Sequence, residues 1–218
     1  MTDFNRDDLS DQSLDWEEEG RKRVYDGFRP VEEVILSHRA LANGEMLGPM
    51  HRQVLLTSLV TLVIPYDPVL DAIVVIRQFR LGAAMRLGHA AMLELPGGMV
   101  DEGEFPQEAA RRELEEETGL RAKTLAPGYE IMAAPALTDE LAMVFLAIVD
   151  ASTLAESAGN HHEHEDIRPI AARVDDLIRA ADDGRIVNGY LVGGLNWFAR
   201  KGRAMAATLI SMPEGNEP

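Results

Sequence analysis

The sequence predicts an α/β protein, namely an α/β/α sandwich with a mixed sheet, preceded by a small N-terminal antiparallel β unit. Apolar, β-branched runs at residues 54–66, 72–79 and 142–149 are typical of buried strands. A helical pattern lies between the second and third runs at residues 106–118, and another follows them at residues 188–205. Strands that flank one helix and precede a second favour a sheet covered by helices.

The N-terminal part of the chain is predicted to contain a tail and then the β unit. Residues 1–20 are acidic and poor in apolar side chains, which predicts a disordered tail. An amphipathic partner-binding helix around Leu14 and Trp16 is the alternative.

The β unit is predicted over residues 21–56. Residues 24–40 carry β-branched and aromatic side chains around turn formers. Asn43 and Gly44 then mark a tight turn before a return strand around residues 51–56.

The main domain is predicted over residues 57–207, with a disordered tail at residues 208–218. The first two apolar runs become strands joined by a turn at residues 67–71. The other elements expected are a short strand at residues 93–95, a turn at Pro96-Gly97-Gly98, a helix at residues 174–182 that Gly184 stops, and the helix at residues 188–205.

The composition limits the classes of function. The 218 residues include no cysteine, which excludes disulfides, thiolate metal sites and cysteine nucleophiles. A net charge of −16 argues against nonspecific nucleic-acid binding. The first residues do not resemble a secretory signal and no apolar run is long enough to span a bilayer, so we expect a cytoplasmic protein without a membrane partner.

Residues 98–120 carry eight acids and two arginines, a local charge of −6. Here Glu113, Glu116 and Glu117 lie at positions i, i+3 and i+4 of the expected helix, so their side chains share one face. Mg²⁺ prefers oxygen ligands and commonly bridges a protein to phosphate. The pattern indicates a metal site for diphosphate chemistry, but glutamates at this spacing alone are also typical of a solvated surface helix. Arg112 precedes Glu116 by four residues, and we include it in the catalytic set as a residue that holds the carboxylates in place.

The full spacing resembles the signature of the Nudix hydrolases. Its fixed positions are Gly98, then Glu104 after five residues, and, after seven more, the run RELEEETGL that ends at Leu120. Phe105 departs from the Ser, Thr or Asp expected as a helix cap, which affects the helix start but none of the ligands.

The resemblance implies a metal-dependent hydrolase of diphosphate bonds. It assigns Mg²⁺, with Mn²⁺ as the alternative, to the carboxylates of Glu113, Glu116 and Glu117 and to the Gly97 carbonyl, with Glu116 counted among the catalytic residues. Such a cation would neutralise the diphosphate oxygens and lower the pKa of a bound water.

Sequence outside this pattern resembles the ADP-ribose pyrophosphatase branch. Pro135 falls fifteen residues after Leu120, and similar pieces occur in order at residues 26–28, 52–53, 77–80, 93–98 and 134–140. This implies hydrolysis of ADP-ribose to AMP and ribose 5-phosphate by a homodimer whose N-terminal unit crosses to the other subunit. Two alternatives stay open: another nucleoside diphosphate sugar such as GDP-mannose, or a Nudix module that binds ADP-ribose without cleaving it.

The acidic, histidine-rich stretch at residues 161–168 is similar to the catalytic loop of bacterial ADP-ribose pyrophosphatases. By this resemblance Glu163 is the base that activates water, and Glu165 is a further metal ligand or an aid to the base. Contiguous histidines without cysteine would make a poor zinc site. The alternative to a catalytic loop is an ordinary solvated loop.

Four residues are expected to bind the substrate. Phe28 would stack on adenine, or be an ordinary core phenylalanine. Arg52 and Arg80 would each donate a fork of hydrogen bonds to phosphate, although surface arginines often do nothing specific. Glu140 would contact the terminal ribose or the metal shell.

Overall fold

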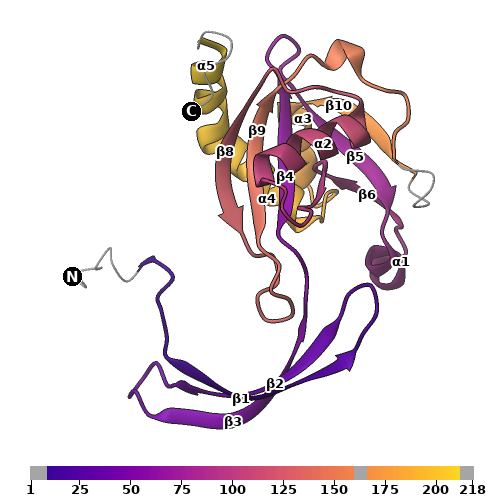
Figure 1. Ribbon diagram of the computed structural model, residues 1–218. Coiled ribbons are helices and arrows are strands. Elements are labelled where there is room, and N and C mark those ends of the chain that lie inside the picture. Colours follow the sequence, from indigo (N-terminus) through magenta and orange to yellow (C-terminus); the bar gives the residue numbers. More distant parts are fainter. Residues whose placement is uncertain (1–8, 160–165, 212–218) are drawn as a thin grey trace. The chain divides into compact units, whose positions relative to one another are not determined.

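The computed structural model describes residues 9–159 and 166–211, and the chain divides into two compact units (Figure 1). The first unit comprises the chain up to Thr57 together with Ala134–Asp139, and the second comprises Ser58–Ala133 and the chain from Glu140 onward. The sequence indicated a boundary close to Thr57, but it gave no sign that residues 134–139 belong with the N-terminal unit.

The first unit is an antiparallel sheet in which β2 (Val31–Arg39) lies between β1 (Trp16–Tyr25) and β3 (Met46–Leu55). The expected tail at residues 1–20 is wrong at its C-terminal end, because β1 begins at Trp16, and the alternative of a helix around Trp16 is wrong too. This strand is stabilised by its ladder with β2 and by charge rather than by apolar burial. Arg21 and Arg23 both form ion pairs with Glu32 of β2, with N–O distances of 2.9 and 3.0 Å.

Residues 134–139 pack along the end of β3 through backbone and side-chain hydrogen bonds. Leu55 N–H donates to the Leu137 carbonyl (2.9 Å), and Thr57 N–H donates to the Asp139 carboxylate (2.7 Å). These contacts explain why a segment from the middle of the sequence belongs to the first unit.

The second unit contains a seven-stranded sheet, which is mixed, as predicted. Its strand order is β10-β5-β4-β9-β8, with β6 paired to β5 and β7 paired to β4, and β4 runs parallel to β9. The strands are β4 (Val60–Asp67), β5 (Ala72–Phe79), β6 (Ala91–Glu94), β7 (Gly97–Met99), β8 (Thr124–Ile131), β9 (Ala142–Ile148) and β10 (Arg168–Arg173).

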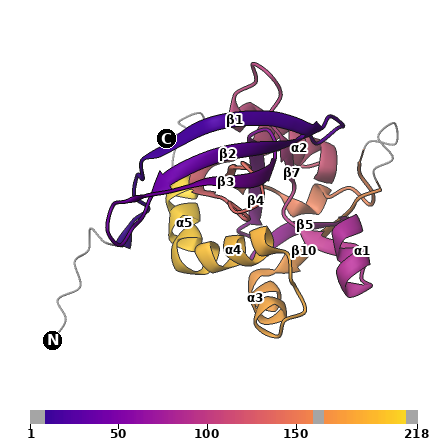
Figure 2. The same ribbon diagram turned by 90° about the horizontal axis from the view of Figure 1, so that it is seen from below.

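Helices cover both faces of this sheet (Figures 1 and 2). Helix α2 (Pro106–Thr118) packs Leu114 against Val63 and Phe145 on one face. On the other face, Ile64 and Leu146 share a core with α3 (Val174–Asp182), α4 (Gly189–Trp197) and α5 (Arg203–Ser211). The predicted α/β/α sandwich is confirmed.

Four local features differ from the prediction. The tail predicted at residues 208–218 is wrong at its start, because α5 continues to Ser211. Gly97 and Gly98 were expected in a turn, but they form strand β7 opposite Leu62 and Thr61. The expected helix at residues 188–205 is two helices, α4 and α5, joined by a π-helical segment at Phe198–Gly202. Helix α1 (Leu81–Leu87) was not anticipated, and none of its residues is buried, so no apolar periodicity marks it.

Within the described residues, the helices are too short or too polar to cross a membrane.

Candidate metal and substrate site

Helix α2 has the bounds that the sequence predicted, and its two ends explain why. Pro106 occupies the first turn, and Gly119 ends the helix in the left-handed region with φ 73°. Phe105 offers no side-chain acceptor at the N-cap, but its own N–H donates to the Glu108 carboxylate at 3.3 Å. Ala110 and Leu114 are fully buried, which fixes the rotation of the helix and leaves the glutamate face directed away from the core.

Arg112 binds three acids and one carbonyl around this glutamate face. Its guanidinium donates to both Glu104 oxygens (3.0 and 2.9 Å), to Glu113 (2.8 Å) and to Glu116 (3.3 Å), and to the carbonyl of Met99 in β7 (3.2 Å). The hydrogen bond from Arg112 holds the pKa of Glu104 below its usual range. The same pairing with Glu104 raises the pKa of Arg112 and keeps the guanidinium charged. These contacts orient the carboxylates around Arg112, and its part in catalysis stays a prediction.

Strand β7 meets the helix through a buried carboxylate. Glu117 is 5% exposed, and its Oε2 accepts a hydrogen bond from Gly97 N–H at 2.7 Å. A Cβ on Gly97 would lie 2.1 Å from the Thr61 carbonyl oxygen, and one on Gly98 would lie 2.3 Å from Glu113 Oε1. Both positions therefore need glycine so that the strand can approach β4 on one side and the carboxylates on the other.

The structure brings together Gly97, Glu113 and Glu117, three of the predicted metal-site residues, and it places Glu116 at the edge of the same face. Within the described residues, however, no three acids or histidines converge as a metal cage. The physical reason is visible in the contacts, since Glu113 and Glu116 are drawn to Arg112, and Glu117 binds the Gly97 amide. Carboxylate oxygens beside a glycine backbone are the donors that a hard divalent cation prefers, so the donor set fits such an ion. The predicted loop residues Glu163 and Glu165 lie outside the described residues.

Arg80, expected to bind phosphate, forms a bidentate pair with Glu94 at the end of β6. Its Nε and terminal nitrogen approach Glu94 Oε2 at 2.9 and 2.7 Å. Glu94 is 8% exposed and also accepts from the side-chain amides of Gln78 (3.2 Å) and Asn188 (3.1 Å). No sequence pattern indicates this network, in which Glu94 and Asn188 are 94 positions apart.

Glu140, the other substrate residue expected in the second unit, accepts a short hydrogen bond from the Tyr190 hydroxyl. Burial of the ring, together with this carboxylate, raises the pKa of Tyr190. The tyrosine therefore stays protonated and acts as a donor at neutral pH.

Comparison with known proteins assigns the family. The family model described as NUDIX domain matches residues 57–190, which contain α2 and β7. The chain belongs to the Nudix family. The expected membership in the Nudix hydrolases is confirmed.

Two curated relatives extend the match beyond the Nudix domain. The ADP-ribose pyrophosphatase of Escherichia coli K12 is 33% identical over 178 residues, which cover 82% of this chain and 85% of that protein. The ADP-ribose pyrophosphatase of Haemophilus influenzae is 32% identical over 182 residues, covering 82% and 83%. A crystal structure titled as an ADP compounds hydrolase superposes with a TM-score of 0.67 at 20% identity and covers 89% of this chain and 98% of that one, which shows the same fold.

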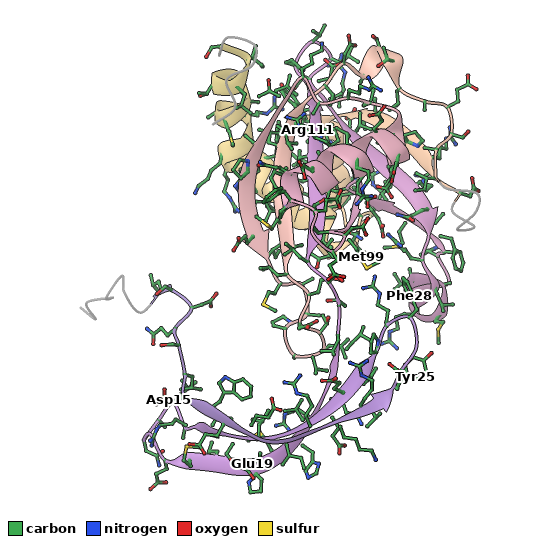
Figure 3. All side chains as sticks on the ribbon, in the orientation of Figure 1. Asp15, Glu19, Tyr25, Phe28, Met99 and Arg111 are labelled. Atoms are coloured by element: carbon green, nitrogen blue, oxygen red, sulfur yellow. The ribbon has the colours of Figure 1, made fainter. Side chains whose placement is uncertain are left out.

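Phe28 and Arg52 belong to the first unit and lie outside the Nudix domain. Phe28 follows β1 and is 83% exposed, so the alternative of a core phenylalanine is wrong (Figure 3). The Arg29 guanidinium lies 5.5 Å from its ring centroid. Arg52 is exposed on β3 and donates to the carbonyl of His51 at 2.9 Å.

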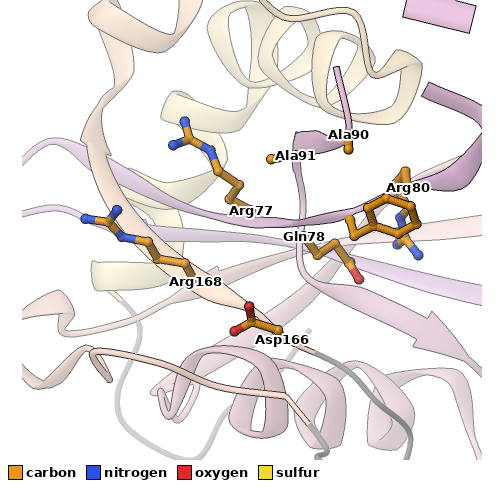
Figure 4. Close-up of a pocket in the computed structure, with 8 residues that line it drawn as sticks. Arg77, Gln78, Arg80, Ala90, Ala91, Asp166 and Arg168 are labelled. Atoms are coloured by element: carbon orange, nitrogen blue, oxygen red, sulfur yellow. The ribbon is translucent and has the colours of Figure 1, made fainter. Parts of the chain in front are cut away.

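The Nudix domain also holds a pocket of about 430 Å³ at the end of β5, beside Arg80 (Figure 4). Arg77 and Arg168 line it from directly opposed positions on β5 and β10. Neither guanidinium group has a hydrogen-bond or ion-pair partner among the described residues. Asp166 is the acid in the lining, so the pocket is positively charged in a protein with a net charge of −16. Both arginines stand in stretches that resemble the branch, but sequence reasoning assigned them no role.

Proposed function

We propose that this Nudix hydrolase cleaves the diphosphate bond of ADP-ribose to give AMP and ribose 5-phosphate. The observation that carries the proposal is the ordered glutamate face of α2, where Arg112 and the Gly97 amide hold three carboxylates beside β7. The relatives that cover most of the chain bear the name ADP-ribose pyrophosphatase, which supports the choice of substrate.

Hydrolases of this kind generally depend on divalent metal ions. Here Glu113, Glu116, Glu117 and the Gly97 carbonyl would hold Mg²⁺, with Mn²⁺ as the alternative. When bound, such an ion neutralises the diphosphate oxygens and makes a bound water more acidic. Arg112 bridges and orients two of these carboxylates, because one of its terminal nitrogens donates to an oxygen of Glu113 and to an oxygen of Glu116.

The remaining roles are assigned to residues on both units. Glu163 accepts the proton from the attacking water, and Glu165 supplies a further ligand or aids that base. Arg80, whose guanidinium Glu94 orients, binds a phosphate oxygen, and Glu140 contacts the terminal ribose. Phe28 stacks on adenine, for which its 83% exposure is suitable.

The other substrate residue of the first unit, Arg52, binds phosphate. We infer a homodimer in which the first unit of one subunit serves the Nudix domain of the other. Within the described part of this unit, Val34 is the buried apolar residue, and Trp16, Val24 and Tyr25 are all exposed. A three-stranded sheet with so little burial needs another surface to pack on. A cytoplasmic location stays a prediction.

A panel of substrates tests the proposed reaction. ADP-ribose, GDP-mannose, NADH and diadenosine polyphosphates are incubated with Mg²⁺, Mn²⁺ or EDTA, and the products are identified by phosphorus NMR. We expect ADP-ribose to give the highest kcat/KM and no turnover in EDTA, with a Glu116→Gln chain as the inactive control.

Two results would contradict the proposed function and support an alternative. Preferred cleavage of GDP-mannose would assign the enzyme to another nucleoside diphosphate sugar. Tight ADP-ribose binding without products would make the protein a binding module, although each carboxylate of the Nudix signature is present.

A further inference from the structure

The first turn of α4 contacts two separate parts of the candidate substrate site. Asn188 caps this helix, since its Oδ1 accepts from Leu191 N–H at 2.9 Å. Its other side-chain atom, Nδ2, donates to Glu94 Oε1 at 3.1 Å. Two residues later, Tyr190 donates to Glu140. One short segment therefore reaches both acidic groups, and the helix cap fixes where it starts.

Asn188 completes the environment of a buried carboxylate. Glu94 is held by Arg80, Gln78 and Asn188, and a buried carboxylate with fewer donors would pay a desolvation cost. Because both Glu94 oxygens accept from Arg80, the orientation of Glu94 determines the direction of the Arg80 guanidinium. Asn188 therefore affects the direction of the Arg80 guanidinium indirectly, through Glu94.

Tyr190 acts on Glu140 in the same way. Its ring packs against the core on the α4 side of the sheet, and its hydroxyl reaches the carboxylate. A ring held by packing presents its hydroxyl with little loss of conformational entropy.

We propose that Asn188 and Tyr190 are positioning residues, which hold Arg80 and Glu140 in the orientation that binds the nucleotide sugar. This rests on the proposed function, in which Arg80 and Glu140 contact substrate. Neither Asn188 nor Tyr190 takes part in the chemistry itself. Their effect falls on substrate binding more than on the rate of the bound complex.

The test uses variants that remove one interaction each. Asn188→Ser keeps a good N-cap but cannot reach Glu94, and Tyr190→Phe removes only the hydroxyl. Matched controls are Asn196→Ser, on the exposed side of the same helix, and Tyr129→Phe, whose buried hydroxyl has no partner among the described residues. We expect KM to rise about tenfold in both test variants, with kcat changed less than threefold and Tm close to that of the controls.

A double-mutant cycle separates positioning from a general structural role. If Asn188 acts through Arg80, Asn188→Ser should change KM no further in a chain that already carries Arg80→Ala. Full additivity of the two changes would overturn the proposal, as would an unchanged KM in both single variants. A lower Tm without a change in KM would assign Asn188 and Tyr190 to stability alone.

If the proposed function is wrong, the experiments give a result that differs from failure of the positioning role. In that case the wild-type chain cleaves no member of the substrate panel. The orientation of Arg80 is then read from the NMR resonance of its Nε–H group, which should shift in Asn188→Ser and not in Asn196→Ser. An unchanged resonance would overturn the positioning role independently of any substrate.

Discussion

The two sheets of this protein are stabilised in different ways. In the seven-stranded sheet, β4 is buried at each position, and cores lie on both of its faces. In the three-stranded sheet, β1 is exposed at nearly all of its positions. The seven-stranded sheet carries its own apolar core, whereas the three-stranded sheet depends on backbone pairing and on ion pairs.

The charged residues that lie opposite each other on neighbouring strands also differ between the two sheets. In the small sheet, Lys22 and Arg23 of β1 lie opposite Glu33 and Glu32 of β2. In the large sheet, Arg77 lies opposite Arg168. Opposite charges stabilise a strand pair that has little burial, while a buried sheet tolerates a like-charged pair at its edge. The large sheet therefore has the burial needed for stability of its own, whereas the small sheet relies on strand pairing and on opposite charges.

The largest expected effect tests whether the chemistry resides in the large unit. Glu117→Gln should lower kcat by about three orders of magnitude, since it removes a charged oxygen that the proposed cation requires. The fold should persist, because Gln has a helix propensity close to that of Glu. Steady-state kinetics and thermal unfolding measure both quantities. Glu115→Gln, on the same helix and paired to Arg121, is the control and should retain activity.

If Glu117→Gln at saturating Mg²⁺ cleaves ADP-ribose at the wild-type rate, the metal role of this helix face is wrong.

The second effect tests whether the small sheet serves a partner subunit. One chain carries Phe28→Ala and Arg52→Ala, and the other carries Glu116→Gln, so that each is inactive alone. If sites are shared, each heterodimer regains one of its two sites, about half of a dimer's activity. The measurement is ADP-ribose turnover after mixing and verified subunit exchange. Exchange without recovery would mean that each site is built from a single chain.

The third prediction concerns the stability of the small sheet at low pH. The hydrogen bonds from Arg23 and Arg21 hold the pKa of Glu32 below its usual range. The stability that Glu32 contributes is therefore present at neutral pH and is lost as the pH falls through its lowered pKa. We expect β1 to lose its order at a higher pH than the large sheet does. Fluorescence of Trp16 in a Trp197→Phe chain reports the small sheet, and circular dichroism reports the whole.

Glu32→Gln serves as the control and should remove most of this pH dependence. A single transition seen by both measurements would contradict the separate stability of the two sheets.

The smallest effect is a stabilisation. Arg168→Thr removes the like charge opposite Arg77 and introduces a side chain that suits a strand. The free energy of unfolding should rise by about 0.2–1 kcal/mol, measured by urea denaturation. Arg179→Thr, on α3, provides a surface control. A loss of stability in Arg168→Thr would mean that Arg168 has a stabilising role that its contacts do not explain.

The structural features that depend on local periodicity could be predicted from the sequence. The bounds of α2 follow from Pro106, Gly119 and the burial of Leu114, all of which are visible in a single stretch. The sandwich itself follows from apolar runs around that helix. Arg112 was within reach of prediction too, because its partners Glu113 and Glu116 are near neighbours along the helix.

What the sequence did not predict depends on contacts between distant residues. Strand β1 is polar, so only its pairing with β2 identifies it as a strand. The glycines of β7 are typical of a turn until Thr61 and Leu62 are placed opposite them. The contact between Asn188 and Glu94 leaves no pattern in either stretch of sequence, because each residue also suits an ordinary local role.

The hydrogen bond between the Gly97 amide and Glu117 makes one backbone proton a reporter of the whole site. A cation that takes Oε2 of Glu117 competes with this amide for the same oxygen. The rate at which the Gly97 proton exchanges with deuterium should therefore respond to metal binding before any substrate is added. A single NMR signal could then rank divalent ions, inhibitors that displace them and variants of the glutamate face, all without an enzymatic assay.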